Sequence, residues 1–321
     1  MTAGPNRPAT TRIAPSPTGA LHLGNLRTFL VNWAMARQRD WKIVLRIEDL
    51  DGPRVKPGAI EQCIDLLSWV GINWDEGPLI QSEDLEPYEA AMARLAREGL
   101  VYPCELTRSE IEAAASAPQE GSGELRYPPE LRPPLSSMEF VDRGTNWRLA
   151  IPDEAVRFID GFAGDQSHNP HQSVGDFVIW TKRAQPSYQL AVVVDDARQG
   201  ITHIVRGDDL LDSAARQTLL YRALGLEEPA EWFHLPLVVG EDGRRLAKRH
   251  GDTRTATYRQ RGVPPERVIG LMAFWCGIVD RPEPMSASEF CRALDPARMS
   301  REPVVFTQED DAWLLGDSQR S

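Results

Sequence analysis

Short apolar segments alternate with amphipathic ones in the first part of the sequence, and this alternation limits the possible folds more than any other feature. The sequence predicts a strand at residues 12–14, a Pro-rich turn at residues 15–19, and a second strand at residues 43–47 that ends at Glu48. After each strand, apolar residues recur at the spacing of a helix. They are Leu26, Phe29, Leu30 and Trp33 after the first strand, and Ile60, Cys63, Ile64 and Leu67 after the second. Such alternation predicts a doubly wound parallel sheet in an α/β fold, which binds ligands beyond the carboxyl ends of its strands.

The later sequence leaves this pattern and then returns to it. A Pro-rich stretch from Tyr102 to Pro134 predicts an inserted subdomain. Strands are predicted again at residues 188–194 and 201–205, and a helix is predicted over residues 213–224. More helices are expected after a basic loop that follows residue 243.

Composition narrows the class of protein. The 321 residues are 41% hydrophobic and 26% charged, as in ordinary globular proteins. The apolar runs are shorter than the roughly 20 residues that span a bilayer, so no membrane segment is expected. Four scattered cysteines without a CxxC pair indicate a reducing, cytoplasmic compartment. The net charge of −11 argues against nonspecific coating of nucleic acid, so a nucleic-acid partner would need a local basic patch.

Two segments carry features of a phosphate-binding site. His22 to Asn25 lie where a turn opens a helix, and helix N-termini bind anions, while Gly24 would let a ligand approach the backbone. The sequence contains neither GxxxxGK[ST] nor GxGxxG, so both common phosphate cradles are excluded. Lys248, in the basic loop, could close over a polyphosphate. Each feature alone also fits a structural histidine or a solvated loop, and only their combination favours the phosphate site.

The order of these segments resembles the glutamyl branch of the class I aminoacyl-tRNA synthetases. Residues 12–25 are similar to the first signature of that family, the HIGH-type element, and residues 245–249 are similar to its KMSKS-type element. Ala247 stands where the family usually has serine, although the lysine remains. The resemblance covers residues 11 to 315 and implies a Rossmann-like, HIGH-type nucleotidyl transferase sheet with an inserted α+β subdomain and a mostly helical C-terminal segment.

The same resemblance implies a division of the chain. The two halves of a Rossmann-like catalytic domain would occupy residues 1–101 and 188–240. An inserted acceptor-binding-like subdomain would occupy residues 102–187. A KMSKS-type loop and a helical, stem-contact-like segment would follow at residues 241–321, with no anticodon-binding domain.

The resemblance also implies ATP-dependent activation of L-glutamate through an acyl-adenylate, with Mg²⁺ as cofactor. The expected catalytic residues are His22 and Lys248, which would stabilise the ATP phosphates. The expected ATP-binding residues are His22, Gly24, Asn25, Arg245, Lys248 and Arg249. The expected glutamate-binding residues are Arg12, Ala14, Ser16, Glu48, Tyr188 and Arg206. This last set has a physical logic, because two carboxylates and one ammonium need cationic contacts and an anionic one.

Within this family the sequence is more similar to the glutamyl-queuosine tRNA synthetases than to the full-length glutamyl-tRNA synthetases. Residues 191–196 and 205–211 carry this similarity, whereas residues 248–253 and 258–315 are more similar to the full-length enzymes. The subgroup implies transfer of glutamate to the queuosine base in the anticodon loop of tRNA(Asp). A monomer is the default expectation. Two alternatives stay open: a discrete glutamyl-tRNA synthetase that charges the 3′ end of tRNA(Glu), and a non-catalytic synthetase-like paralogue.

No metal site is expected. The subgroup often holds zinc on Cys-x-Cys, Tyr and Cys, but here Cys104 has the first position, Leu106 the second, and Tyr127 is the one plausible third ligand. One thiolate cannot complete the usual four-ligand site, so zinc is not expected. His168 and His171 are expected to have no acidic or Cys companion nearby and are interpreted as part of a polar loop.

A basic segment is the expected RNA-docking surface. Residues 244 to 267 hold eight Lys or Arg and two acids, against the acidic balance of the whole chain. The basic residues are Arg244, Arg245, Lys248, Arg249, Arg254, Arg259, Arg261 and Arg267.

Overall fold

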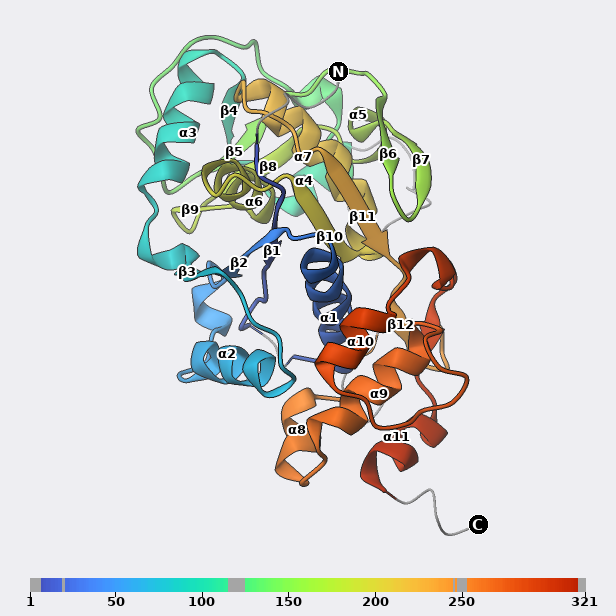
Figure 1. Ribbon diagram of the computed structural model, residues 1–321. Helices are drawn as coiled ribbons and strands as arrows, with labels where there is room; N and C mark the ends of the chain where they lie inside the picture. The colour runs from blue at the N-terminus through green and yellow to red at the C-terminus, as the bar shows by residue number, and fades with distance from the viewer. Residues whose placement is uncertain (1–6, 19–20, 115–124, 245, 247–252, 317–321) are drawn as a thin grey trace.

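The first part of the chain forms a parallel sheet with helices between its strands. The computed structural model describes residues 7–18, 21–114, 125–244, 246 and 253–316 (Figure 1). Its first elements are β1 (Thr10–Ile13), α1 (Leu23–Gln38), β2 (Lys42–Ile47), α2 (Ala59–Trp69), β3 (Glu76–Ile80) and α3 (Glu86–Arg97). The strands are parallel and lie in the order β1-β2-β3. Every residue of β2 after Lys42 is buried, as expected for a parallel strand covered on both faces.

A second sheet joins strands that are distant in the sequence, in the order β10-β11-β6-β7. Its elements are β6 (Val156–Asp160), β7 (Gly164–His168), β10 (His203–Gly207) and β11 (Glu231–Leu235). β10 and β11 are parallel, while β6 and β7 form an antiparallel pair. The amide of Thr202, just before β10, donates to the carbonyl of Thr10 at 2.9 Å, which places this sheet beside β1.

An antiparallel sheet occupies most of the segment that was predicted to be inserted. Its order is β4-β5-β8-β9. The elements are β4 (Val101–Cys104), α4 (Arg108–Ala114), β5 (Asn146–Leu149), α5 (Pro170–Ser173), β8 (Phe177–Thr181) and β9 (Gln185–Pro186). The ring of Phe140 packs edge-on against Trp147 and Trp180, with centroids 5.2 and 5.0 Å away. This aromatic contact lies in a core that the sheet shares with α3 and with residues 190–194 and 215–224.

The predicted strand at residues 188–194 is wrong, because this segment forms the helix α6 (Tyr188–Arg198). Every residue from Gln189 to Asp196 is buried, so the helix lacks a polar face over most of its length. An apolar run without a polar face carries no periodicity that separates a helix from a strand. The strand and helix predicted next are confirmed as β10 and α7 (Leu211–Ala223), with shifted ends.

The C-terminal part is mostly helical, as predicted. Its elements are β12 (Val238–Val239), α8 (Thr255–Gln260), α9 (Pro265–Trp275), α10 (Ala287–Ala293), β13 (Val304–Val305) and α11 (Gln308–Leu315). Figure 1 shows α1 between these helices and the strands β1 and β10, and α1 contacts β1, β10 and α10. Among the described residues, no helix combines the length and apolar character needed to cross a bilayer.

A buried ionic cluster joins α6 to the first two strands. Arg46 Nη1 donates to Asp196 Oδ1 at 2.6 Å, and Arg12 Nε lies 3.4 Å from the same oxygen. Arg46 Nη2 donates to Glu48 Oε1 at 3.0 Å. Burial alone would lower the pKa of Arg46, but the carboxylates of Asp196 and Glu48 raise it overall. Because Asp196 and Arg46 are fully buried, removing either charge would leave the other without its main countercharge in a low-dielectric interior.

We therefore expect Asp196→Ala to lower the free energy of unfolding by about 3 to 5 kcal/mol, measured by urea denaturation. The matched control is Asp84→Ala, since Asp84 pairs with Arg198 at 3.0 Å on the surface. The control should cost no more than about 1 kcal/mol. Equal losses in the two variants would contradict a structural role for the cluster.

Candidate active site

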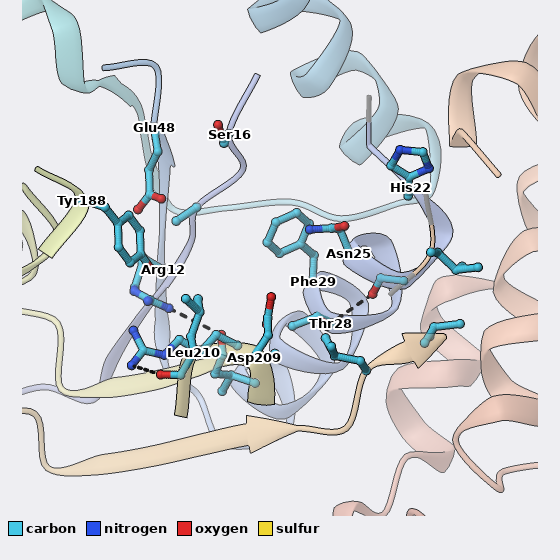
Figure 2. Close-up of a pocket in the computed structure, with 18 residues that line it drawn as sticks. Arg12, Ser16, His22, Asn25, Thr28, Phe29, Glu48, Tyr188, Asp209 and Leu210 are labelled. Carbon is cyan, nitrogen blue, oxygen red and sulfur yellow. Dashed lines mark hydrogen bonds between the residues drawn. The ribbon is translucent and has the colours of Figure 1, made fainter. Parts of the chain in front are cut away.

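The predicted site residues that the structure describes meet around one cavity. It has a volume of about 300 Å³ and lies where β1, β2 and β10 end and α1 begins. The predicted residues in its lining are Arg12, Ala14, Ser16, His22, Gly24, Asn25, Glu48, Tyr188 and Arg206. Figure 2 shows Arg12, Glu48 and Tyr188 on one side and His22 on the other, with Phe29 between them. The sheet thus presents a cavity at the edge that its strand order predicts.

Three predicted ATP-binding residues, Arg245, Lys248 and Arg249, lie outside the described residues. Leu246, between them in the sequence, is buried and lines the cavity. The KMSKS-type element therefore reaches this cavity through at least one of its residues.

The HIGH-type element is tied to the chain that follows the basic loop. His22 is the N-cap residue of α1, and its Nδ1 lies 3.0 Å from the hydroxyl of Thr253. The amide of Leu23 donates to the carbonyl of Thr253 at 3.1 Å, and the amide of Thr255 donates to that of Leu21 at 2.8 Å. These contacts fix the imidazole at the helix N-terminus, where backbone amides attract anions.

Gly24 has a packing role that differs from the predicted one. A Cβ at this position would lie 3.2 Å from Cβ of Val238 on β12. The missing side chain therefore lets α1 approach β12 closely, although Gly24 also lines the cavity. The prediction had assigned this space to a ligand.

Glu48, Arg12 and Arg206 lie close to Tyr188 in the cavity, and Asp209 is a further charged residue of the lining. Burial raises the pKa of Glu48, while the cations Arg46 and Arg12 oppose this rise. Burial of the phenol and the nearby Glu48 raise the pKa of Tyr188, so its hydroxyl stays protonated at neutral pH. Arg206 is only 5% exposed and adds a second guanidinium to that of Arg12. An anion, two cations and a hydroxyl therefore face one space, which suits a zwitterionic ligand.

The sequence analysis missed several lining residues. Phe29 was named only for its helical spacing, yet it faces the cavity (Figure 2). Asp209 and Leu210 belong to a segment that marked the subgroup, but neither had been given a role. Thr28 and Val238 also line the cavity and carried no signal of their own in the sequence.

A second cavity shares Tyr188 with the first. Its volume is about 640 Å³, and it lies between the antiparallel sheet and the starts of α6 and α7. Arg148 and Arg216 line it. So does Gln189, whose Oε1 is buried and accepts no hydrogen bond from the residues that the structure describes. The charged residues of this second space are arginines, and they lie beside apolar residues such as Ile111 and Phe177.

The residues considered for a metal site have partners of other kinds. Cys104 Sγ lies 3.8 Å from the hydroxyl of Tyr127, so these two predicted neighbours do meet. The expectation that His168 and His171 lack an acidic companion is wrong. Asp212 lies 3.0 Å from His168, and Asp153 lies 3.7 Å from His171. In the described parts of the chain, no three potential metal ligands come together. The absence of zinc stays a prediction.

Comparison with known proteins agrees with this geometry. A family model described as the catalytic domain of class I tRNA synthetases (E and Q) matches residues 8–313. A relative from Symbiobacterium thermophilum, named glutamyl-Q tRNA(Asp) synthetase, is 46% identical over 95% of this chain and 98% of its own length. A glutamate–tRNA ligase from Thermodesulfovibrio yellowstonii is 34% identical over 94% of this chain and 64% of its own.

Solved structures agree as well. A glutamate tRNA ligase from Elizabethkingia meningosepticum, crystallised in complex with its amino acid, superimposes with a TM-score of 0.78. It is 27% identical to this chain, and the match covers 95% of this chain and 68% of the ligase. The fold class and the family predicted from the sequence are thereby confirmed. The chain belongs to the class I tRNA synthetases of the glutamate and glutamine type, and within them to the group of the glutamyl-Q tRNA(Asp) synthetases.

Proposed function

We propose that this protein activates L-glutamate with ATP and Mg²⁺ and transfers it to the queuosine base in the anticodon loop of tRNA(Asp), acting as a cytoplasmic monomer. One observation carries the activation step: Glu48, Arg12 and Arg206 face a single cavity beside the N-terminus of α1. Glu48 would hold the ammonium group of glutamate, and the two arginines its carboxylates. Ala14, Ser16 and Tyr188 would complete the binding site.

In the activation step a glutamate carboxylate oxygen attacks the α-phosphorus of ATP in line, and pyrophosphate leaves. Negative charge develops on the phosphate oxygens, and His22 and Lys248 would stabilise it. Gly24 and Asn25 would hold ATP at the helix start, with Arg245 and Arg249 on the loop. The product is an acyl-adenylate whose carbonyl can accept a nucleophile from the RNA.

The second cavity supports a transfer step next to the same site. We propose that it receives the acceptor nucleoside, because its volume of about 640 Å³ lies within the usual range for ligand sites. Arg148 and Arg216 could contact a phosphate, and Gln189 could accept a hydrogen bond from a ribose or base. The segment 102–187 would then act as the acceptor-binding subdomain.

The central test is where the glutamate is attached. We expect mass analysis of tRNA incubated with the protein, ATP and glutamate to find a base-labile glutamate on the queuosine of tRNA(Asp). Glutamate on the 3′-terminal adenosine would support the alternative of a discrete glutamyl-tRNA synthetase. Unmodified tRNA would support a non-catalytic paralogue.

A second experiment separates activation from transfer. We expect glutamate-dependent exchange of pyrophosphate into ATP without any tRNA, because the proposed glutamate contacts all come from this chain. Exchange that appears only after tRNA is added would contradict this and favour the glutamyl-tRNA synthetase alternative.

The expected RNA-docking surface needs one refinement. Arg259 already pairs with Asp65 and lies over the ring of Trp69, with Cζ 5.6 Å from its centroid. Arg267 packs on Trp313 and donates to its carbonyl. Reversing either charge would therefore also break contacts within the protein, whereas Arg261 is exposed at the C-terminus of α8.

We expect Arg261→Glu to weaken tRNA binding and to reduce the salt dependence by about one unit for each lost phosphate contact. Glutamate activation should survive in this variant. A matched surface control is Arg281→Glu, which lies outside the basic segment. Unchanged affinity and salt dependence in Arg261→Glu would show that this surface is only solvated.

A further inference from the structure

A buried chain of three side chains runs behind the cavity, from β6 across β11 to β10. Asp160 ends β6, His234 lies on β11, and Arg206 lies on β10. They are 2%, 1% and 5% exposed. His234 Nδ1 lies 2.6 Å from Asp160 Oδ2, and Arg206 Nε lies 2.9 Å from His234 Nε2. Of the three, only Arg206 lines the cavity.

Backbone amides determine the direction of the hydrogen bonds at the Asp160 end of this row of side chains. Asp160 Oδ1 accepts hydrogen bonds from the amides of Phe162, Ala163 and His234, at 2.9, 2.7 and 3.2 Å. Because all three groups are donors, the atom that faces them must be an acceptor. The second carboxylate oxygen is then the one that faces the imidazole.

The guanidinium of Arg206 determines the direction of the hydrogen bond at the other end. The Nε–H group of an arginine is always a donor, so His234 Nε2 must accept and cannot carry a proton. The proton of the neutral ring therefore sits on Nδ1 and is donated to Asp160. Burial lowers the pKa of His234 to about 4, against the opposing hydrogen bond to Asp160, so the ring is neutral at physiological pH. Only one tautomer satisfies both neighbours.

The other contacts of Arg206 complete its orientation. Arg206 Nη1 donates to Gln217 Oε1 at 2.8 Å, and Nη2 donates to the carbonyl of Leu210 at 3.1 Å. The guanidinium also lies over the ring of Trp232, with Cζ 5.0 Å from its centroid. With Nε bound to His234, three of the five N–H groups have partners among the described residues. One N–H group on each terminal nitrogen is left for a ligand.

We propose that His234 and Asp160 are positioning residues that hold Arg206 for a carboxylate of the substrate. His234 fixes the rotation of the guanidinium through Nε, and the carboxylate of Asp160 fixes the tautomer that makes this contact possible. The identity of the ligand as glutamate rests on the proposed function, whereas the tautomer does not.

The sharpest test is Asp160→Asn, which preserves size. The three backbone amides would keep the amide oxygen on their side, so the NH₂ group would face His234 Nδ1. The ring would then need its proton on Nε2, directly opposite the Nε–H donor of Arg206. We expect the Michaelis constant for glutamate in pyrophosphate exchange to rise about 10- to 100-fold, because a buried donor is left unsatisfied. The constant for ATP should not change.

Two further variants separate positioning from general stability. His234→Gln can still accept from Arg206 and donate to Asp160, so it should stay closer to the wild-type constant than His234→Phe, which can do neither. The control is His203→Phe: His203 lies on β10 as well, but its ring packs on Trp41, with centroids 4.1 Å apart. His203→Phe should leave the constant for glutamate unchanged.

A spectroscopic measurement reads the tautomer directly, whatever the ligand is. Long-range ¹H–¹⁵N spectra of the wild-type protein should show His234 protonated on Nδ1 and not on Nε2. Protonation on Nε2 would overturn the proposal, and so would an Asp160→Asn variant that folds and keeps its affinity for glutamate. If the wild-type protein shows no glutamate-dependent exchange while the Nδ1 tautomer is found, the proposed function fails, and the hydrogen-bond arrangement of Asp160, His234 and Arg206 stands.

Discussion

The carboxylate of Asp196 holds the charged half of the candidate site together. It takes a hydrogen bond from Arg46 at 2.6 Å and lies 3.4 Å from Arg12, and Arg46 in turn orients Glu48. Because Asp196 and Arg46 are fully buried, neither can relax into water, so their geometry is fixed before any ligand arrives. Such preorganisation lets polar groups stabilise a charged ligand without reorganising when it binds.

Two networks with a similar design therefore support the two arginines of the cavity. Asp196 lies beside Arg12, and Asp160 acts on Arg206 through His234. In each network a buried carboxylate supports a guanidinium that lines the cavity, directly for Arg12 and through His234 for Arg206. The supporting carboxylates come from α6 and β6, outside the first βα units, so the site depends on the docking of distant segments.

The sequence predicted the parts of this arrangement that local rules determine. Alternation of strands and helices predicted the sheet. The resemblance to the synthetases assigned Glu48 and Arg206 to the site, in agreement with the rule that ligands bind at the carboxyl ends of strands. The helix α6 was mistaken for a strand because a fully buried apolar run has no periodicity. Asp160 and His234 could not be paired in advance, since 74 residues separate them and only the strand order brings them together.

The most direct measurement is a crystal structure of the protein with L-glutamate bound. Arg206 should donate its remaining N–H groups to one carboxylate, and the ammonium should face Glu48, in the cavity that Tyr188 also lines. The Asp160, His234 and Arg206 side chains should keep their present positions, because they are preorganised. Glutamate bound elsewhere, or bound with its ammonium beside Arg206, would contradict this description of the site.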